Sequence, residues 1–282
     1  MKVNEILGID DFTFIEPSFL ALTDPRYNAV LGNGDWDEGR LLLDEDEEPV
    51  AMAFHGSRGW MGGSFLCSNP SVTLIELFEG VNGEILQEDR SVWAAAVREY
   101  FSEKLLIETP PAIDDLNPVR TGILAEVITG AWGRGSGETC IDGCCGSGVG
   151  SRVLRELGYS PLSYDNDPAL IARGLTTHRL LPEETMCLDA TIASEYIDPV
   201  PRGIGVMMGE INSFSQEMWE GIVSELFAVT GETLITVGTR EEAQLICTWG
   251  EARKRDVLVQ ESPGDSFYDH WVCIAHTKNE GV

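Results

Sequence analysis

Residues 138–151 read Glu-Thr-Cys-Ile-Asp-Gly-Cys-Cys-Gly-Ser-Gly-Val-Gly-Ser, an apolar strand pattern that runs through a glycine-rich turn into a helical pattern. Glycines at such a turn let a ligand approach the backbone and leave helix N–H groups accessible. Two acidic stretches, Tyr164–Pro168 and Leu188–Ala190, each follow or end a further predicted strand. Because the carboxyl ends of parallel strands meet at one edge of a sheet, we expect all three segments to border one adenosine-sized crevice.

The spacing and charge of these segments narrow the kind of ligand. Asp165 follows Gly146 by 19 residues, the separation expected of an acid that accepts hydrogen bonds from ribose hydroxyls. A carboxylate at Asp189 can accept a hydrogen bond from an adenine amino group. Asp142 stands just before the turn, where it would repel a pyrophosphate and favour a cationic group. The pattern therefore predicts an adenosine ligand with a positive charge and no phosphate.

From residue 118 onward, strand and helix patterns alternate. Strands separated by helices imply parallel pairing with right-handed crossovers. The last two strands have only a loop between them, so they should form an antiparallel hairpin. The expected strands are 138–143, 161–164, 186–189, 203–208, 233–237, 255–259 and 271–276, and the expected helices are 119–132, 148–157, 168–180, 215–229 and 240–249.

Residues 1 to about 105 have a different pattern, with short apolar runs between turn-rich pieces. The runs are 40–43, 50–54 and 72–78, and the turn-rich pieces are 32–35, 56–63 and 82–83. They predict short antiparallel strands joined by tight turns, and the acidic run 44–48 is expected to be a solvated turn. A helix should follow at 90–106 and end at Thr109-Pro110-Pro111. We therefore expect two domains, 1–110 and 111–282.

The motifs Ile141–Gly150, Ser163–Pro168 and Leu188–Ala190 resemble the successive motifs of S-adenosylmethionine-dependent methyltransferases with the Rossmann-like (class I) fold. The resemblance covers about residues 118–276. It implies an α/β domain with a mostly parallel, seven-stranded sheet and an antiparallel C-terminal hairpin. It also implies an enzyme that uses S-adenosyl-L-methionine as its cofactor. The resemblance does not extend to the strand-rich N-terminal domain, and we expect that domain to select the substrate or to mediate oligomerisation.

The resemblance also implies roles for individual residues. Where the family loop usually has a glycine, this chain has Cys144, whose Cβ leaves room for the ligand if its φ is negative. Arg120 either pairs with the methionine carboxylate or is an ordinary residue of a helix surface. The implied cofactor contacts are Asp142 near the methionine amino group, Gly146 and Gly148 in the loop, Asp165 at the ribose, Asn166 beside the adenine, and Asp189 with Ala190 at the adenine amino group.

The segment after the fourth strand, Gly209–Phe214, is the expected acceptor side. Family members that methylate amide or base nitrogens carry Asn-Pro-Pro-Tyr there, so its sequence argues against those substrates. Glu210 and Asn212 are the candidate catalytic residues, with Glu210 as a possible general base. Alternatively, Glu210 is a solvated acid that caps the helix beginning near Ser215. Tyr268–Trp271 lie near the expected substrate mouth.

The net charge limits the possible partners. Lys and Arg number 19 against 47 Asp and Glu, which gives a net charge of −28. Such a chain repels nucleic acids and anionic membranes, and no apolar run reaches membrane-spanning length. The start lacks a secretory signal, so we expect a cytoplasmic protein with reduced cysteines. Position 147 is Ser, which removes the third ligand of an iron–sulfur motif, and we predict no metal site.

Three alternatives to methyl transfer stay open at this point. Gly146–Ser151 is close to a nicotinamide-dinucleotide motif, which would suit an NAD(P)-dependent oxidoreductase, although Asp142 argues against it. An aminopropyltransferase-like enzyme shares the fold and would suit an acidic protein, but its Gly-Gly-Gly-Asp loop is absent. Because of Cys144, a non-catalytic domain that binds a cofactor or a partner is the third alternative. Our leading hypothesis is S-adenosylmethionine-dependent methyl transfer to an unidentified small molecule or protein, by a chain that could form a homo-oligomer.

Overall fold

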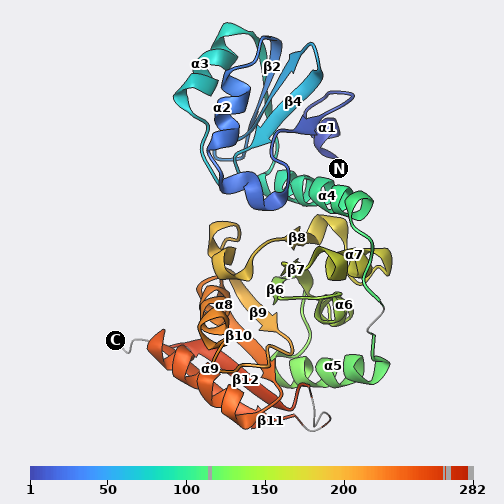
Figure 1. Ribbon diagram of the computed structural model, residues 1–282, viewed down its shortest axis with the longest axis vertical. Helices are drawn as coiled ribbons and strands as arrows, with labels where there is room; N and C mark the ends of the chain where they lie inside the picture. Colours follow the sequence, from blue (N-terminus) through green and yellow to red (C-terminus); the bar gives the residue numbers. More distant parts are fainter. Residues whose placement is uncertain (114–115, 263, 265–267, 279–282) are drawn as a thin grey trace. The chain divides into compact units, whose positions relative to one another are not determined.

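The computed structural model describes all residues except 114–115, 263, 265–267 and 279–282. The chain divides into two compact units, Met1–Lys104 and Leu105–Val282 (Figure 1). In the part of the chain that is described, no helix has both the length and the apolar character needed to cross a bilayer.

The N-terminal unit is built on a five-stranded mixed sheet in the order β1-β4-β3-β2-β5. Neighbours β2, β3 and β4 are antiparallel, whereas β1 pairs with β4 and β5 pairs with β2 in parallel. Its elements are α1 (Val3–Ile6), β1 (Thr13–Phe14), the 3-10 helix η1 (Phe19–Thr23), α2 (Arg26–Gly32), β2 (Trp36–Leu43), β3 (Pro49–Gly56), β4 (Gly59–Ser64), α3 (Val72–Gly80) and β5 (Asn82–Gln87). Helix α4 (Arg90–Glu108) begins in this unit.

Two predictions for this unit were wrong. The run 72–78, expected as a strand, is helix α3, because the Ser71 hydroxyl accepts a hydrogen bond from the Leu74 N–H and caps the first turn. Leu74 and Phe78, four residues apart, are both buried on one face of that helix. Asn82-Gly83, expected as a hairpin turn, instead begins strand β5. The sheet is consequently mixed rather than antiparallel.

The C-terminal unit contains a seven-stranded sheet in the order β11-β12-β10-β9-β6-β7-β8. All neighbours pair in parallel except β12, which is antiparallel to both β10 and β11. This confirms the predicted mostly parallel sheet with a C-terminal hairpin. The strands are β6 (Thr139–Gly143), β7 (Ser160–Asp165), β8 (Thr185–Cys187), β9 (Val200–Gly205), β10 (Thr230–Val237), β11 (Arg255–Glu261) and β12 (Trp271–Thr277).

Helices cover both faces of this sheet. Helices α5 (Pro118–Trp132) and α6 (Val149–Glu156) pack on one face, and α8 (Gln216–Ala228) and α9 (Arg240–Ala252) on the other (Figure 1). Helix α7 (Pro168–Thr176) and the 3-10 helices η2 (Pro182–Glu184) and η3 (Ala190–Glu195) connect β7, β8 and β9. Strand β9 ends at Gly205, three residues before the predicted end, so residues 206–208 leave the sheet.

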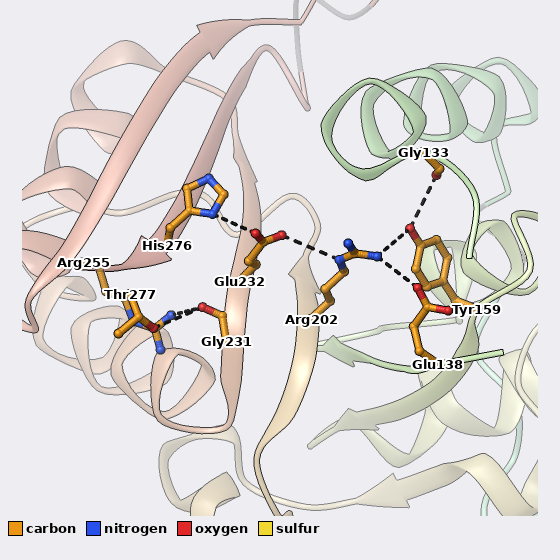
Figure 2. A network of polar contacts seen from close by, with 9 residues as sticks. All are labelled: Gly133, Glu138, Tyr159, Arg202, Gly231, Glu232, Arg255, His276 and Thr277. Carbon is orange, nitrogen blue, oxygen red and sulfur yellow. Dashed lines mark hydrogen bonds and ion pairs between the residues drawn. The ribbon is translucent and has the colours of Figure 1, made fainter. Parts of the chain in front are cut away.

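Ion pairs connect the amino ends of β6, β9 and β10. Arg202 lies 3.0 Å from a Glu138 carboxylate oxygen and 3.6 Å from a Glu232 carboxylate oxygen, and it donates to the Tyr159 hydroxyl at 3.3 Å (Figure 2). His276 on β12 lies 3.1 Å from the other Glu232 oxygen. Acids at this edge of the sheet are therefore matched by cations.

Candidate functional site

A pocket of about 490 Å³ opens at the carboxyl ends of β6, β7, β8 and β9 in the C-terminal unit. Its volume lies within the range of small-molecule sites. The register of the parallel strands explains the position, because Asp142 is level with Ser163 on β7, and Asp165 is level with Cys187 on β8. The predicted residues that line the pocket are Arg120, Asp142, Cys144, Gly146, Asp165, Asn166, Asp189 and Ala190.

Asp142 is a buried acid at the base of this pocket, with 1% of its surface exposed. The Ser151 hydroxyl, in the first turns of α6, donates to its Oδ2 at 2.5 Å and contacts the Ser163 hydroxyl at 2.8 Å. Burial raises the pKa of Asp142 to about 6, against the lowering effect of its hydrogen bonds with Ser151. A cationic group in the pocket would favour the ionised form.

Asp165 organises the glycine-rich loop. The Gly146 N–H donates to its Oδ2 and the Asp167 N–H to its Oδ1, both at 2.8 Å. Burial raises the pKa of Asp165, and these backbone hydrogen bonds oppose the rise. Each carboxylate oxygen keeps a second lone pair, so Asp165 can still accept hydrogen bonds from two hydroxyls of a ligand.

Asp189 is an exposed acid at the start of η3. Its Oδ1 accepts from the Thr191 N–H at 2.9 Å and from the Thr191 hydroxyl at 2.8 Å. Its Oδ2 has no hydrogen bond to any residue that the structure describes. The capping interaction fixes one oxygen and leaves the other able to accept from a ligand amino group.

Cys144 adopts a left-handed backbone conformation with φ of 55°. The condition under which its Cβ was expected to leave room for the ligand, a negative φ, is therefore not met. Left-handed conformations are disfavoured for residues with a Cβ, which accounts for glycine being the usual residue at this place. Burial, followed by the charges of Asp165, Asp142 and Asp189, raises the pKa of its thiol above the usual range. The thiol is therefore protonated and is no candidate nucleophile.

Gly148 is not among the residues that line the pocket. It is the N-cap of α6 with φ of 81°, and a Cβ there would lie 2.6 Å from the Leu180 side chain. Its glycine is explained by backbone conformation and by packing against Leu180.

Arg120 lines the pocket from the first turn of α5. Its Nε donates to Asp269 Oδ2 at 2.6 Å and its Nη2 to Asp269 Oδ1 at 3.3 Å. Asp269 is fully buried and also accepts from the Thr236 hydroxyl at 2.5 Å. Arg120 is thus held in a bidentate pair rather than free on a helix surface.

Sequence reasoning missed the apolar wall of the pocket, which comes from the end of β9 and from α8. Methionine side chains are flexible and adapt to apolar ligands of different shapes. Val206 to Met208 leave the sheet after β9, and the Met207 N–H donates to the Thr236 hydroxyl at 2.7 Å. The missed residues of this wall are Val206, Met207, Met208, Met218, Trp219 and Ile222.

The two candidate catalytic residues lie outside the pocket lining. Glu210 and Asn212 are exposed in the turn between β9 and α8. The Glu210 carbonyl accepts from the Asn212 side-chain amide at 3.3 Å and from the Ser215 hydroxyl at 3.0 Å. The Asn212 side chain accepts from the Phe214 N–H at 2.9 Å. In this conformation these hydrogen bonds of Glu210 and Asn212 stabilise the turn.

The charges in the pocket are strongly unbalanced. Three carboxylates line it, from Asp142, Asp165 and Asp189, and Arg120 is the one cation among the described lining residues. That cation is already paired with Asp269. A pyrophosphate would meet three acids and no unpaired cation, whereas a cationic ligand without phosphate would meet complementary charge.

No protein-family model matches this sequence, and no curated protein is significantly similar to it. Solved structures are similar in fold. One is a TehB-like S-adenosylmethionine-dependent methyltransferase from Corynebacterium glutamicum, 18% identical, with a TM-score of 0.43 over 56% of this chain and 88% of that one. Another is magnesium protoporphyrin IX methyltransferase from Synechocystis PCC 6803 with bound S-adenosylmethionine, 13% identical, with a TM-score of 0.46 over 65% and 97%.

The strand order has β7 and β8 on one side of β6 and the other four strands on the opposite side, where the antiparallel hairpin forms the far end of the sheet. The C-terminal unit has the Rossmann-like fold predicted for class I methyltransferases. The likeness to these solved structures is one of fold.

Proposed function

We propose that this chain is an S-adenosylmethionine-dependent methyltransferase whose cofactor binds in the pocket at the carboxyl ends of β6, β7 and β8. The observation that carries the proposal is the set of three pocket carboxylates, against which the described lining residues set only one cation, Arg120, already paired with Asp269. S-adenosylmethionine is an adenosine with a sulfonium and an ammonium group and no phosphate. Its charges complement those of the pocket.

The residues fit the parts of this cofactor in a definite order. Asp165 would accept hydrogen bonds from the ribose hydroxyls, and the unengaged oxygen of Asp189 from the adenine amino group. Asp142 would face the ammonium group, and Arg120 the carboxylate. When bound, the cofactor supplies a methyl group that its sulfonium sulfur already activates. The protein's contribution is then mainly to align the donor and acceptor and to exclude water.

The charge of the pocket also supports this cofactor over its rivals. A nicotinamide dinucleotide carries a pyrophosphate, which three carboxylates disfavour. An aminopropyl donor lacks the amino-acid carboxylate, and Arg120 would then have no partner in the ligand. A non-catalytic domain would bind the cofactor with similar affinity but would not transfer its methyl group. A methyl-transfer assay therefore distinguishes that alternative from an enzyme.

The acceptor side of the proposal rests on the apolar wall. Met207, Met218 and Trp219 offer apolar surface, which suits a small acceptor with an apolar body. Glu210 as a general base stays a prediction. Replacement of Glu210 by Gln should lower kcat for acceptors that must lose a proton and leave cofactor affinity unchanged. Cytoplasmic location, homo-oligomerisation, and a substrate-selecting or oligomerising role of the N-terminal unit also stay predictions.

Calorimetric titration of the full chain with S-adenosylmethionine, S-adenosylhomocysteine and NADH tests the proposal. Micromolar binding of the two sulfur ligands without NADH binding is the expected result, because only NADH brings phosphates into the acidic pocket. Binding of NADH alone would contradict the proposal. After binding is established, transfer of a labelled methyl group to a panel of small apolar acceptors separates an enzyme from a non-catalytic cofactor-binding domain.

A further inference from the structure

The C-terminal hairpin contacts a pocket-lining residue, Arg120, through the buried side chain of Asp269. Asp269, just before β12, pairs with Arg120, which lies 149 residues earlier on α5. The two side chains meet through two N–H···O contacts, of 2.6 Å and 3.3 Å. This fork-to-fork geometry fixes both the position and the plane of the guanidinium group.

Asp269 is more confined than its partner. It is 0% exposed, whereas the Arg120 side chain is 19% exposed and lines the pocket. The Thr236 hydroxyl, at the end of β10, donates to Asp269 Oδ1 at 2.5 Å. Asp269 is fixed to the sheet by its hydrogen bond from Thr236, and its ion pair with Arg120 orients the exposed part of that side chain toward the pocket.

Arg120 keeps unused donors in this arrangement. Asp269 engages its Nε and Nη2, and its Nη1 has no hydrogen bond to any residue within the described part of the chain. Asp142 lines the same pocket, so a carboxylate-binding cation and an ammonium-binding acid are presented together. Opposite charges of this kind match the two ends of an α-amino acid.

We propose that Asp269 is a positioning residue, which orients Arg120 to bind the amino-acid carboxylate of the ligand. This inference rests on the proposed function, because it concerns the methionine part of that cofactor. It gives the antiparallel hairpin a role in ligand recognition. It also predicts that Asp269 matters for ligands that carry the amino acid and not for those that lack it.

The test compares two ligands by calorimetry on the full chain: S-adenosylhomocysteine, and 5′-methylthioadenosine, which lacks both the carboxylate and the ammonium group. In Asp269→Asn, the affinity for S-adenosylhomocysteine should fall about tenfold or more, because the guanidinium loses its fixed orientation. The affinity for 5′-methylthioadenosine should stay within about twofold. Asp256→Asn, an exposed hairpin acid paired with Lys278 at 3.4 Å, is the matched control and should change neither affinity.

Two further variants keep the inference testable if Asp269→Asn does not fold. Arg120→Lys keeps the charge but loses the fork, and should weaken S-adenosylhomocysteine binding selectively. The double variant Arg120→Met with Asp269→Leu replaces the ion pair by apolar side chains, an exchange that often preserves stability, and should show the same selective loss.

Equal losses for both ligands would overturn the inference, since they would indicate general damage to the hairpin. Unchanged affinity for both ligands in folded variants would overturn it as well. If the natural chain binds neither ligand, the proposed function itself fails, which is a different result from a loss confined to the variants.

Discussion

Acidic side chains at the two edges of the C-terminal sheet differ in their burial and in their hydrogen-bond and ion-pair partners. At the amino edge, Glu138 and Glu232 share Arg202, and each is partly exposed (Figure 2). At the carboxyl edge, Asp142 and Asp165 are buried and hydrogen-bonded only to hydroxyl and backbone N–H groups among the described residues. Burial raises the pKa values of these two acids, whereas backbone hydrogen bonds dominate the lowered pKa of Glu138.

This difference separates a structural role from a binding role. Acids matched by cations at the amino edge join neighbouring strands. The acids at the carboxyl edge have no cationic partner, so burial disfavours their ionised forms, and a cationic ligand would stabilise those forms. The same sheet therefore combines a charge-balanced edge with an edge prepared for a ligand.

The largest expected effect is the loss of ligand affinity in Asp165→Ala. This acid would accept hydrogen bonds from two ribose hydroxyls, and its loss also frees the Gly146 and Asp167 N–H groups. We expect the affinity for S-adenosylhomocysteine to fall at least about 30-fold, since hydrogen bonds to charged groups are worth about 1.5–3 kcal/mol each. Glu232→Ala at the opposite edge is the matched control, and calorimetry should find its affinity unchanged. Equal losses in both variants would remove the distinction between the edges.

A pH titration of binding tests the unmatched charge directly. The pKa of Asp142 is about 6 because of burial, so below pH 6 this acid is protonated and must release its proton to bind a cation. The affinity for S-adenosylmethionine should then fall by up to about tenfold per pH unit. In Asp142→Asn, binding at pH 7.5 should be weaker and its pH profile flatter, with Asp165 responsible for the remaining slope. A profile that does not change in the variant would contradict the assignment.

Glu16 in the N-terminal unit is an unmatched buried acid that lies outside the residues lining the pocket. Its Oε1 accepts from the Ser64 N–H at 3.2 Å, and its Oε2 is buried without a hydrogen-bond partner among the residues that the structure describes. Burial raises its pKa from 4.5 to about 7, so its stabilising contribution is complete below pH 4.5 and is lost as the pH rises through 7.

Glu16→Gln should therefore raise the free energy of unfolding at pH 8 by about 1–3 kcal/mol, and flatten its decline between pH 4.5 and 7. Urea denaturation at several pH values measures this, and the affinity for S-adenosylhomocysteine should not change. A buried carboxylate without a cationic partner then lowers the free energy of unfolding wherever it lies. It contributes to ligand binding only where it lines a pocket. Parallel pH profiles for the natural chain and the variant would count against this account.

A substitution at the charge-balanced amino edge should change the free energy of unfolding and leave ligand affinity unchanged. Arg202→Met removes the ion pairs with Glu138 and Glu232 and the contacts of the guanidinium with the Trp132 and Tyr159 rings, whose centroids lie 5.6 and 5.9 Å away. We expect a loss of about 1 kcal/mol in the free energy of unfolding, the size of a partly exposed network. Calorimetry should find ligand affinity unchanged, and an affinity loss would mean that the two edges are coupled.

The smallest expected effect concerns the strained loop residue. Cys144→Gly should raise the free energy of unfolding by about 0.5–1 kcal/mol, because glycine adopts a φ of 55° without the penalty of a Cβ. Thermal denaturation of the two proteins measures the difference. A tenfold or greater loss of S-adenosylhomocysteine affinity would instead indicate that the thiol contacts the ligand.

The C-terminal fold could be predicted from the sequence because its signals are local. Each βα unit has its own hydrophobic periodicity and its own residues that mark where an element begins. Examples are Gly146 at the first turn and Asp167-Pro168 at the start of α7. The N-terminal unit was harder. The run at 72–78 is apolar enough for a strand, and only the cap at Ser71 and the spacing of Leu74 and Phe78 identify the helix.

The site could be predicted where it follows from strand ends and not where it follows from tertiary contacts. Asp142, Asp165 and Asp189 are found by position alone, since parallel strands place their ends together. The pairing of Arg120 with Asp269 and the wall formed by Met218 and Trp219 depend on how distant segments pack. No local pattern in a single sequence reports such contacts.

The most direct test is a crystal structure of the full chain grown with S-adenosylhomocysteine. It is predicted to show the ligand at the carboxyl edge of the C-terminal sheet, with the ribose hydroxyls on Asp165, the ammonium group near Asp142 and the carboxylate on Arg120. Ligand density elsewhere on the chain, or with the adenosine reversed so that Asp165 faces the amino acid, would contradict the central claim.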